Sequence, residues 1–286
     1  MKKLKMLLLM ALSLLAGNLY AQEQSNTIER TIELGNTAAN TLLVKNINGS
    51  VEVEGYDGNT IQLVVERTIS AKNKERLQEG LADVQLGIKE DGNTVVVYFD
   101  APFATLKQGN SGRWHYNVNH NNLGYEYTFD MKLRVPENIK LEASSVNGGA
   151  VSVENFRGDV EAHNVNGGVS LSNVSGSSSA RTVNGPIEAQ LSSLPEEAVA
   201  YETVNGDIKV FYPAKLAANV SFETLNGDFY TDFEEVSRRP HEVEKAGKGK
   251  AVVYRIDKGA ELSVNGGGAP LNFKTLNGDV YLQKKK

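Results

Sequence analysis

Apolar and polar positions alternate along most of this chain, and one short unit built on that alternation recurs. The unit reads apolar-x-apolar-x-Thr-Val-Asn-Gly, and alternation resumes after it, as at Ile208 and Val210. Because successive side chains of a strand point to opposite faces, this pattern predicts a β-strand before and after each Asn-Gly pair. The pairs are Asn147-Gly148, Asn166-Gly167, Asn184-Gly185, Asn205-Gly206, Asn226-Gly227 and Asn277-Gly278, with an earlier copy ending at Gly49.

The spacing of these pairs distinguishes two arrangements of the strands. Asn-Gly is the strongest dipeptide for a tight β-hairpin, so a set of separate hairpins is one interpretation. From Gly148 to Gly227, however, the glycine recurs at intervals of 19, 18, 21 and 21 residues, with Gly158 and Gly176 near the half-steps. A steady period of about 20 residues favours an all-β, parallel β-solenoid whose neighbouring coils lie about 4.8 Å apart. The asparagines at successive corners are then expected to hydrogen-bond along the stack as a ladder.

Residues 1–21 have the pattern of a signal peptide. Lys2, Lys3 and Lys5 precede an apolar segment over residues 6–16, which is shorter than the roughly 20 residues that span a bilayer. An N-terminal membrane anchor is the alternative interpretation, and no later stretch is long and apolar enough to predict a transmembrane segment. We therefore expect an exported chain in the periplasm, on the cell surface or outside the cell.

The rest of the chain divides into two parts that we expect to form one continuous domain. Residues 22–136 predict a β-rich N-terminal part with a short helix over 72–82, a β-hairpin after it, and an aromatic insertion over 103–125. Residues 137–283 contain the tight repeats, which a charged loop over 234–250 interrupts. The final copies of the repeat are expected to close the end of the solenoid.

Composition narrows the functional classes. The chain has 286 residues, of which 40% are hydrophobic, and it contains no cysteine. The length and apolar content suffice for a sizeable core. The absence of cysteine excludes a disulfide scaffold, a cysteine nucleophile and a cysteine-ligated zinc site. A formal net charge of −5 offers no basic field for nucleic acid, and no motif points to a cofactor.

Aromatic residues in the insertion are the candidate binding surface. Trp114, the single tryptophan, lies near Tyr116 and Tyr125 among polar residues. Exposed aromatic rings beside amides and charges suit the recognition of sugars or proteins. The alternative is a lid that buries these rings against one end or side of the solenoid.

Two aspartates are a candidate calcium site. Asp207 and Asp228 each follow a corner glycine, and on adjacent coils their carboxylates would lie close enough for Ca²⁺ to bridge them. The alternative is a solvated turn residue that accepts hydrogen bonds from nearby amides. The repeats predict no other metal site and no catalytic residues, because they carry mainly Ser, Asn, Val and Thr instead of clustered acids and bases.

The most regular repeats resemble those of a known family. They read Thr-Val-Asn-Gly-Asp-Ile at 203–208 and Thr-Leu-Asn-Gly-Asp-Phe at 224–229. Together with the early Asn-Gly strand pair, the short helix and the hairpin, they resemble the bacterial family of adhesin-like domains of unknown function. The resemblance covers about residues 27–283, and it implies a β-solenoid fold and an adhesin-like role. The family has no settled activity, so it assigns no functional residue here.

These observations lead us to expect a non-enzymatic, exported interaction protein. It would present a rigid β-solenoid surface to an unidentified protein or glycan in the cell envelope or outside the cell. Two other functions stay open at the level of the sequence. One is a periplasmic structural or envelope-stress scaffold. The other is a carbohydrate-active β-solenoid enzyme, which an assay of sugar release would reveal.

Overall fold

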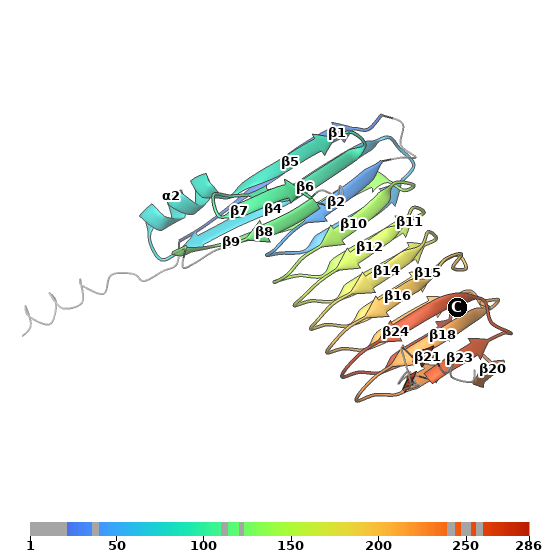
Figure 1. Ribbon diagram of the computed structural model, residues 1–286. Coiled ribbons are helices and arrows are strands. Elements are labelled where there is room, and N and C mark those ends of the chain that lie inside the picture. Colours follow the sequence, from blue (N-terminus) through green and yellow to red (C-terminus); the bar gives the residue numbers. More distant parts are fainter. Residues whose placement is uncertain are drawn as a thin grey trace, which may run out of the picture.

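A computed structural model describes residues 22–35, 40–109, 114–119, 123–238, 244–246, 253–255 and 260–285. The predicted signal peptide over 1–21 lies outside the described residues. So do parts of the aromatic insertion and of the charged loop, at 110–113, 120–122, 239–243 and 247–250. In Figure 1 the coils stack along one axis, with the N-terminal strands at one end and the C-terminal strands at the other.

Two β-sheets, A and B, face each other across one core, and each coil contributes one strand to each sheet (Figure 1). In spatial order, sheet A consists of β1 (Gln22–Glu33), β4 (Thr60–Ala71), β9 (Tyr125–Pro136), β3 (Val51–Tyr56), β11 (Val151–Phe156), β13 (Val169–Val174), β15 (Ile187–Leu191), β17 (Ile208–Tyr212), β25 (Val280–Lys284) and β19 (Phe229–Thr231). Sheet B consists of β20 (Val236–Arg238), β23 (Ala260–Val264), β18 (Ala218–Glu223), β24 (Ala269–Lys274), β16 (Val199–Glu202), β14 (Ser178–Arg181), β12 (Val160–His163), β10 (Lys140–Ser144), β2 (Thr41–Lys45), β6 (Thr94–Asp100) and β5 (Gln85–Asp91). Neighbouring coils pair in parallel, so the β-solenoid is confirmed and the interpretation as separate hairpins is wrong.

Antiparallel strands close the N-terminal end of the stack. β4 pairs with both β1 and β9, and β5 forms the predicted hairpin with β6. The helix α2 (Lys74–Asp83) begins two residues later than predicted, because the side chain of Asn73 caps it by accepting from the backbone N–H of Arg76. Leu77 and Gly80 are its buried residues. Among the described residues, no helix has the length and apolar character needed to cross a membrane.

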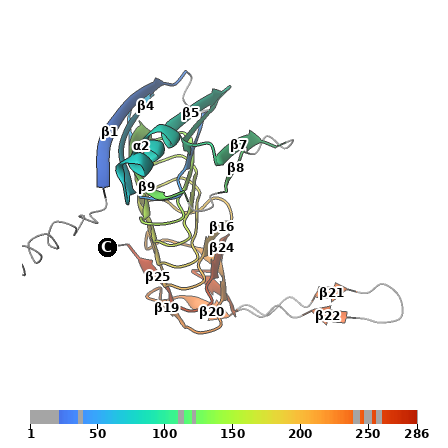
Figure 2. The ribbon, with the colours of Figure 1, turned by 90° about the vertical axis from the view of Figure 1, so that its left-hand side faces the viewer.

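Two antiparallel hairpins stand apart from the sheets. One pairs β7 (Ala104–Gln108) with β8 (Trp114–Val118), and the other pairs β21 (Glu244–Ala246) with β22 (Val253–Arg255). Figure 2 shows β7 and β8 projecting from the side of the solenoid that carries sheet B. The first hairpin therefore lies next to the outer face of that sheet.

The inward positions of the strands fill the core, and one of them changes size along the stack. It is alanine in β10, β12 and β14, but Tyr201 in β16 and Phe273 in β24. The rings of Tyr201 and Phe273 stack with their centroids 5.8 Å apart. The hydroxyl of Tyr201 lies 2.9 Å from that of Ser178, which stands where most coils have Leu or Val. A buried hydroxyl thus has a hydrogen-bond partner inside the core.

The asparagines of the Asn-Gly corners form the predicted ladder. Each side-chain amide nitrogen donates to the amide oxygen of the preceding asparagine in the stack, over N···O distances of 2.7–3.2 Å. In stacking order the asparagines are Asn48, Asn147, Asn166, Asn184, Asn205, Asn277 and Asn226. Each donor is satisfied by the same group one coil away, which explains why one dipeptide recurs at every corner.

A second, buried ladder lies beside the first. Hydroxyl groups three residues before a corner glycine donate to the carbonyl oxygen of the corner glycine in the neighbouring coil, over 2.7–3.2 Å; they belong to Ser145, Thr182, Thr203 and Thr275. This close approach requires glycine, since a Cβ on Gly206 would lie 2.1 Å from the carbonyl oxygen of Gly185. Threonine and glycine in the repeat thus both serve contacts between coils.

The coils do not stack in chain order, and the expectation that the final copies close the solenoid is wrong. The last coil of the chain, β24–β25, lies between β16–β17 and β18–β19. The first coil, β2–β3, likewise lies between β6–β9 and β10–β11. At the C-terminal end the chain turns back through β23, which pairs antiparallel with β18, before it enters the gap. A later segment can take this position because each coil presents similar corner groups to the coil on either side of it.

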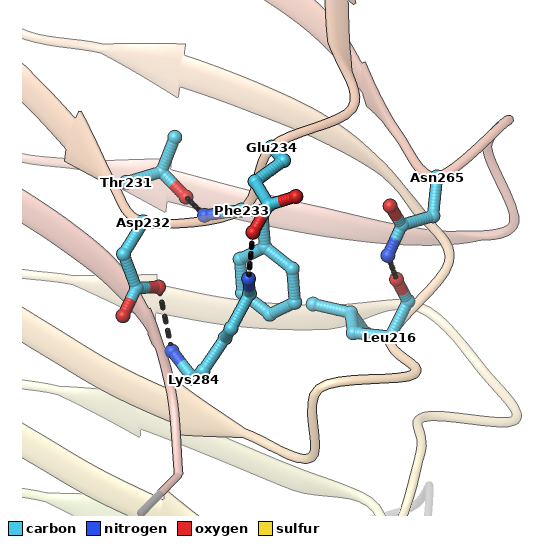
Figure 3. Close-up of polar contacts among 7 residues, drawn as sticks. All are labelled: Leu216, Thr231, Asp232, Phe233, Glu234, Asn265 and Lys284. Atoms are coloured by element: carbon cyan, nitrogen blue, oxygen red, sulfur yellow. Dashed lines mark hydrogen bonds and ion pairs between the residues drawn. The ribbon is translucent and has the colours of Figure 1, made fainter.

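Polar contacts fasten the inserted coil at both of its sheets (Figure 3). The backbone N–H of Lys284, at the end of β25, donates to Asp232 over 2.8 Å, and its ammonium lies 3.4 Å from Glu234. Before β24, the side chain of Asn265 donates to the carbonyl oxygen of Leu216 over 2.7 Å. The segments that precede and follow coil β18–β19 therefore both hold the last coil of the chain.

The asparagine ladder predicts unequal costs for its members. Asn205 forms two ladder bonds, one to Asn184 and one from Asn277, whereas Asn226 forms one among the described residues. At about 1 kcal/mol per hydrogen bond, we expect Asn205→Ala to lower the free energy of unfolding by about 2 kcal/mol and Asn226→Ala by about 1 kcal/mol. Urea denaturation followed by circular dichroism measures both. Equal costs for the two variants would contradict a continuous ladder.

Candidate functional site

Trp114 lies at the start of a strand, packed against sheet B. Its side chain is 8% exposed because it forms a small apolar cluster with Leu43 and Val96. The ammonium of Lys89 lies 4.7 Å from the centre of the indole ring, a cation–π contact. The indole N–H has no hydrogen-bond partner among the described residues.

The other two predicted aromatic residues contact different parts of the molecule. Tyr116 donates its hydroxyl to the carbonyl oxygen of Phe99 over 2.5 Å, and burial raises the pKa of that hydroxyl. Tyr125 is buried and donates to Asp83 at the end of α2 over 2.7 Å, and burial raises its pKa as well. The expectation of one exposed aromatic surface is wrong, because these rings pack against the protein's own strands and helix. A binding role for the three residues stays a prediction.

A groove of about 790 Å³ runs along the outer face of sheet B, with Trp114 in its wall. It crosses six neighbouring strands, β6, β2, β10, β12, β14 and β16. Uncharged polar side chains along it include Thr41, Thr94 and Ser179. Because the strands run across the groove, its long direction follows the axis of the stack.

Ion pairs between neighbouring coils neutralise the charges in and beside the groove. The pairs are Lys45–Glu142, Lys140–Glu161 at 3.4 Å and Arg181–Glu202 at 3.2 Å. Each pair joins two strands that are adjacent in sheet B. Each of these cations is therefore paired with a carboxylate of a neighbouring coil, and the three pairs together carry no net charge.

His163 lies among these ion pairs. Burial lowers its pKa, and the nearby cations Lys45 and Arg181 lower it further, whereas Glu142 and Glu161 act in the opposite direction. With its pKa below the usual value of about 6.5, the imidazole is mainly neutral at physiological pH. It adds a donor and an acceptor to the groove without adding charge.

The expectation that the two candidate calcium residues lie on adjacent coils is wrong. Asp279 of the inserted coil lies between Asp207 and Asp228. Asp207 accepts from the backbone N–H of Asp279 over 3.0 Å, and Asp279 accepts from that of Asp228 over 2.9 Å. Two of these carboxylates therefore hold neighbouring coils together. In the part of the chain that the structure describes, no group of three or more acidic or histidine side chains could hold a metal ion.

Three solved structures are similar to the chain at low sequence identity. A candidate cell adhesion protein from Clostridium sporogenes is 12% identical, and the alignment covers 92% of this chain and 100% of that one, with a TM-score of 0.41. A candidate adhesin from Bacteroides fragilis is 12% identical, with 91% and 97% covered and a TM-score of 0.37. A candidate lipid binding protein from Parabacteroides distasonis is 13% identical, with 91% and 97% covered and a TM-score of 0.23.

Sequence comparison places the chain in a family. No curated protein matches it. The profile of the Toastrack DUF4097 family matches residues 13–258, which is most of the chain. This match confirms the resemblance that the Asn-Gly repeats indicate. The chain belongs to the Toastrack DUF4097 family.

Proposed function

We propose that this protein is an exported, adhesin-like interaction protein that binds its partner along the groove of sheet B. The observation that carries the proposal is the groove itself, which has a volume of about 790 Å³, is lined mainly by polar side chains, and crosses strands that each have neighbours on both sides. A surface that is already rigid loses little conformational freedom when it binds, which raises its affinity for an extended partner. The predicted signal peptide supports export.

The chemistry of the groove supports binding without catalysis. Hydrolysis of a glycosidic bond needs two carboxyl groups beside the bond, one of them protonated to act as the acid. Glu142 and Glu161 each form an ion pair with a lysine of a neighbouring coil. Both carboxylates therefore serve contacts between coils.

Exposure on the cell tests the proposed function. We expect an antibody against the purified protein to label intact cells that produce it about as strongly as it labels lysed cells. An adhesin-like protein must be exposed on the cell surface to reach its partner outside the cell. Surface biotinylation provides an independent measurement, and a cytoplasmic protein that reacts only after lysis is the control for intact cells. Labelling confined to lysed cells would contradict the proposal and favour a periplasmic scaffold.

A further inference from the structure

We infer that the groove of sheet B binds an uncharged, extended glycan whose chain lies along the axis of the solenoid. The inference rests on the proposed function and names the class of partner. Its support comes from three properties of the groove, namely its balance of charges, its repeat distance and the mixture of apolar and polar side chains in its lining.

The charges of the groove lining are balanced. The lining contains two cationic side chains, Lys140 and Arg181, and two carboxylates, Glu142 and Glu161. All four are engaged in ion pairs between coils. A polyanion would meet the carboxylates and a polycation would meet the cations, so neither gains from a field of one sign. A sugar hydroxyl both donates and accepts, and it therefore fits a surface that offers both donors and acceptors.

The repeat distance of the groove favours a chain of sugar rings over a peptide. Neighbouring strands lie about 4.8 Å apart, so the six strands that the groove crosses span about 24 Å. The rings of an extended glycan follow one another at nearly this spacing, and each ring can meet an equivalent position on the next coil. An extended polypeptide repeats every 3.3 Å or so, so its successive residues do not meet equivalent positions on successive coils.

Apolar and polar side chains lie beside one another in the lining of the groove. Toward the N-terminal end, the nearly buried Leu43 and Trp114 line it together with Thr41 and Thr94. Toward the C-terminal end, the small side chains of Ser179 and Ala200 line it. A sugar ring has apolar C–H groups on its faces and hydroxyls at its rim, so it can contact apolar and polar neighbours at once.

The opposite face of the solenoid offers a matched control surface. A depression of about 500 Å³ on the outer face of sheet A is lined by three glutamates and two cationic side chains, so its charges do not balance. Ser170 of β13 belongs to this depression, whereas Ser179 of β14 belongs to the groove. The two serines lie on neighbouring coils, and the same substitution adds the same volume to either face.

Isothermal titration calorimetry of the purified chain with defined hexasaccharides tests the inference. Cellohexaose, chitohexaose and laminarihexaose are the neutral probes, the chitosan hexamer and hexagalacturonate are the charged probes, and gelatin is the polypeptide probe. We expect a neutral probe to bind with an affinity that changes less than about twofold between about 50 and 500 mM NaCl, because salt screens only charges. We expect Ser179→Ile to weaken this binding about tenfold or more by filling the groove, and Ser170→Ile to change it less than about twofold.

Circular dichroism establishes that the variants are folded, and Ala200→Leu replaces Ser179→Ile if the latter does not fold. Failure of every neutral probe to bind, or equal binding to the wild type and the folded groove variant, would overturn the inference. If a charged probe or gelatin binds instead and Ser179→Ile prevents it, the ligand class is wrong and the proposed interaction function stands. New reducing ends released from a bound probe would instead overturn the non-enzymatic function.

Discussion

Removal of residues 269–286 is expected to unfold the C-terminal end of the solenoid while the coils before it stay folded. The deletion removes the coil that lies between β16–β17 and β18–β19. Its inward residues Leu271, Phe273, Val280 and Leu282 are at most 2% exposed. At about 1.5–3 kcal/mol for each buried side chain, about 6–12 kcal/mol of stabilisation is lost, comparable with the whole stability of an ordinary domain.

Hydrogen–deuterium exchange measures where the deletion acts. Amides of β18, β19 and β23 are expected to lose protection, whereas those of β10–β15 keep it, since each coil of a solenoid contacts only its neighbours. A shorter deletion of residues 285–286, which leaves β25 intact, is the matched control. Protection retained in β18 and β19 after the longer deletion would show that the last coil does not hold them.

Phe273→Ala is expected to be among the most destabilising single substitutions in the protein. The ring is 2% exposed, stacks 5.8 Å from Tyr201 and lies 6.4 Å from Phe229, so its loss leaves a cavity shared by three coils. Truncation of a buried phenylalanine costs about 3–5 kcal/mol. Hydrogen exchange of the β24 and β25 amides measures this local loss directly, which suits a repeat protein whose coils need not unfold together.

Leu276→Ala on the same inserted coil is the control for Phe273→Ala. Leu276 is 43% exposed, so we expect its truncation to cost less than about 1 kcal/mol. Tyr201→Phe is a second comparison, because it keeps the stacked ring and removes only the hydroxyl bonded to Ser178. A cost for Phe273→Ala no larger than that for Leu276→Ala would contradict the packing of the inserted coil.

The body of the fold could be predicted from the sequence because stacking places the same chemical group at the same corner of every coil. The asparagine recurs because it bonds to its counterpart one coil away, and the threonine and glycine recur because the threonine hydroxyl donates to the carbonyl oxygen of the corner glycine in the neighbouring coil. The order of the coils could not be predicted for the same reason. Every copy carries the same pattern, so nothing local distinguishes the neighbour of β17 in space, which is β25, from the coil that follows it in the chain.

The candidate site was less accessible to sequence reasoning. The polar sequence around Trp114 suggests that this tryptophan is exposed. In the structure, Trp114 is the first residue of β8 and packs against sheet B. The paired charges of the groove face are visible only when the copies are aligned on the corner glycine and read across coils. Four residues before that glycine stand, in stacking order, Lys45, Ser144, His163, Arg181, Glu202, Lys274 and Glu223.

The first and last coils of the chain, β2–β3 and β24–β25, both lie inside the stack. Each has a coil from the middle of the sequence on either side. A gene that gained a copy of the repeat at its 3′ end would place that copy where both neighbouring positions are already occupied. Duplication within residues 140–212, where chain order and stacking order agree, would insert a coil and leave both ends unchanged. Each such event would lengthen the groove by about 4.8 Å. Tandem duplication in this middle segment is therefore a route by which evolution can adjust the length of the groove alone.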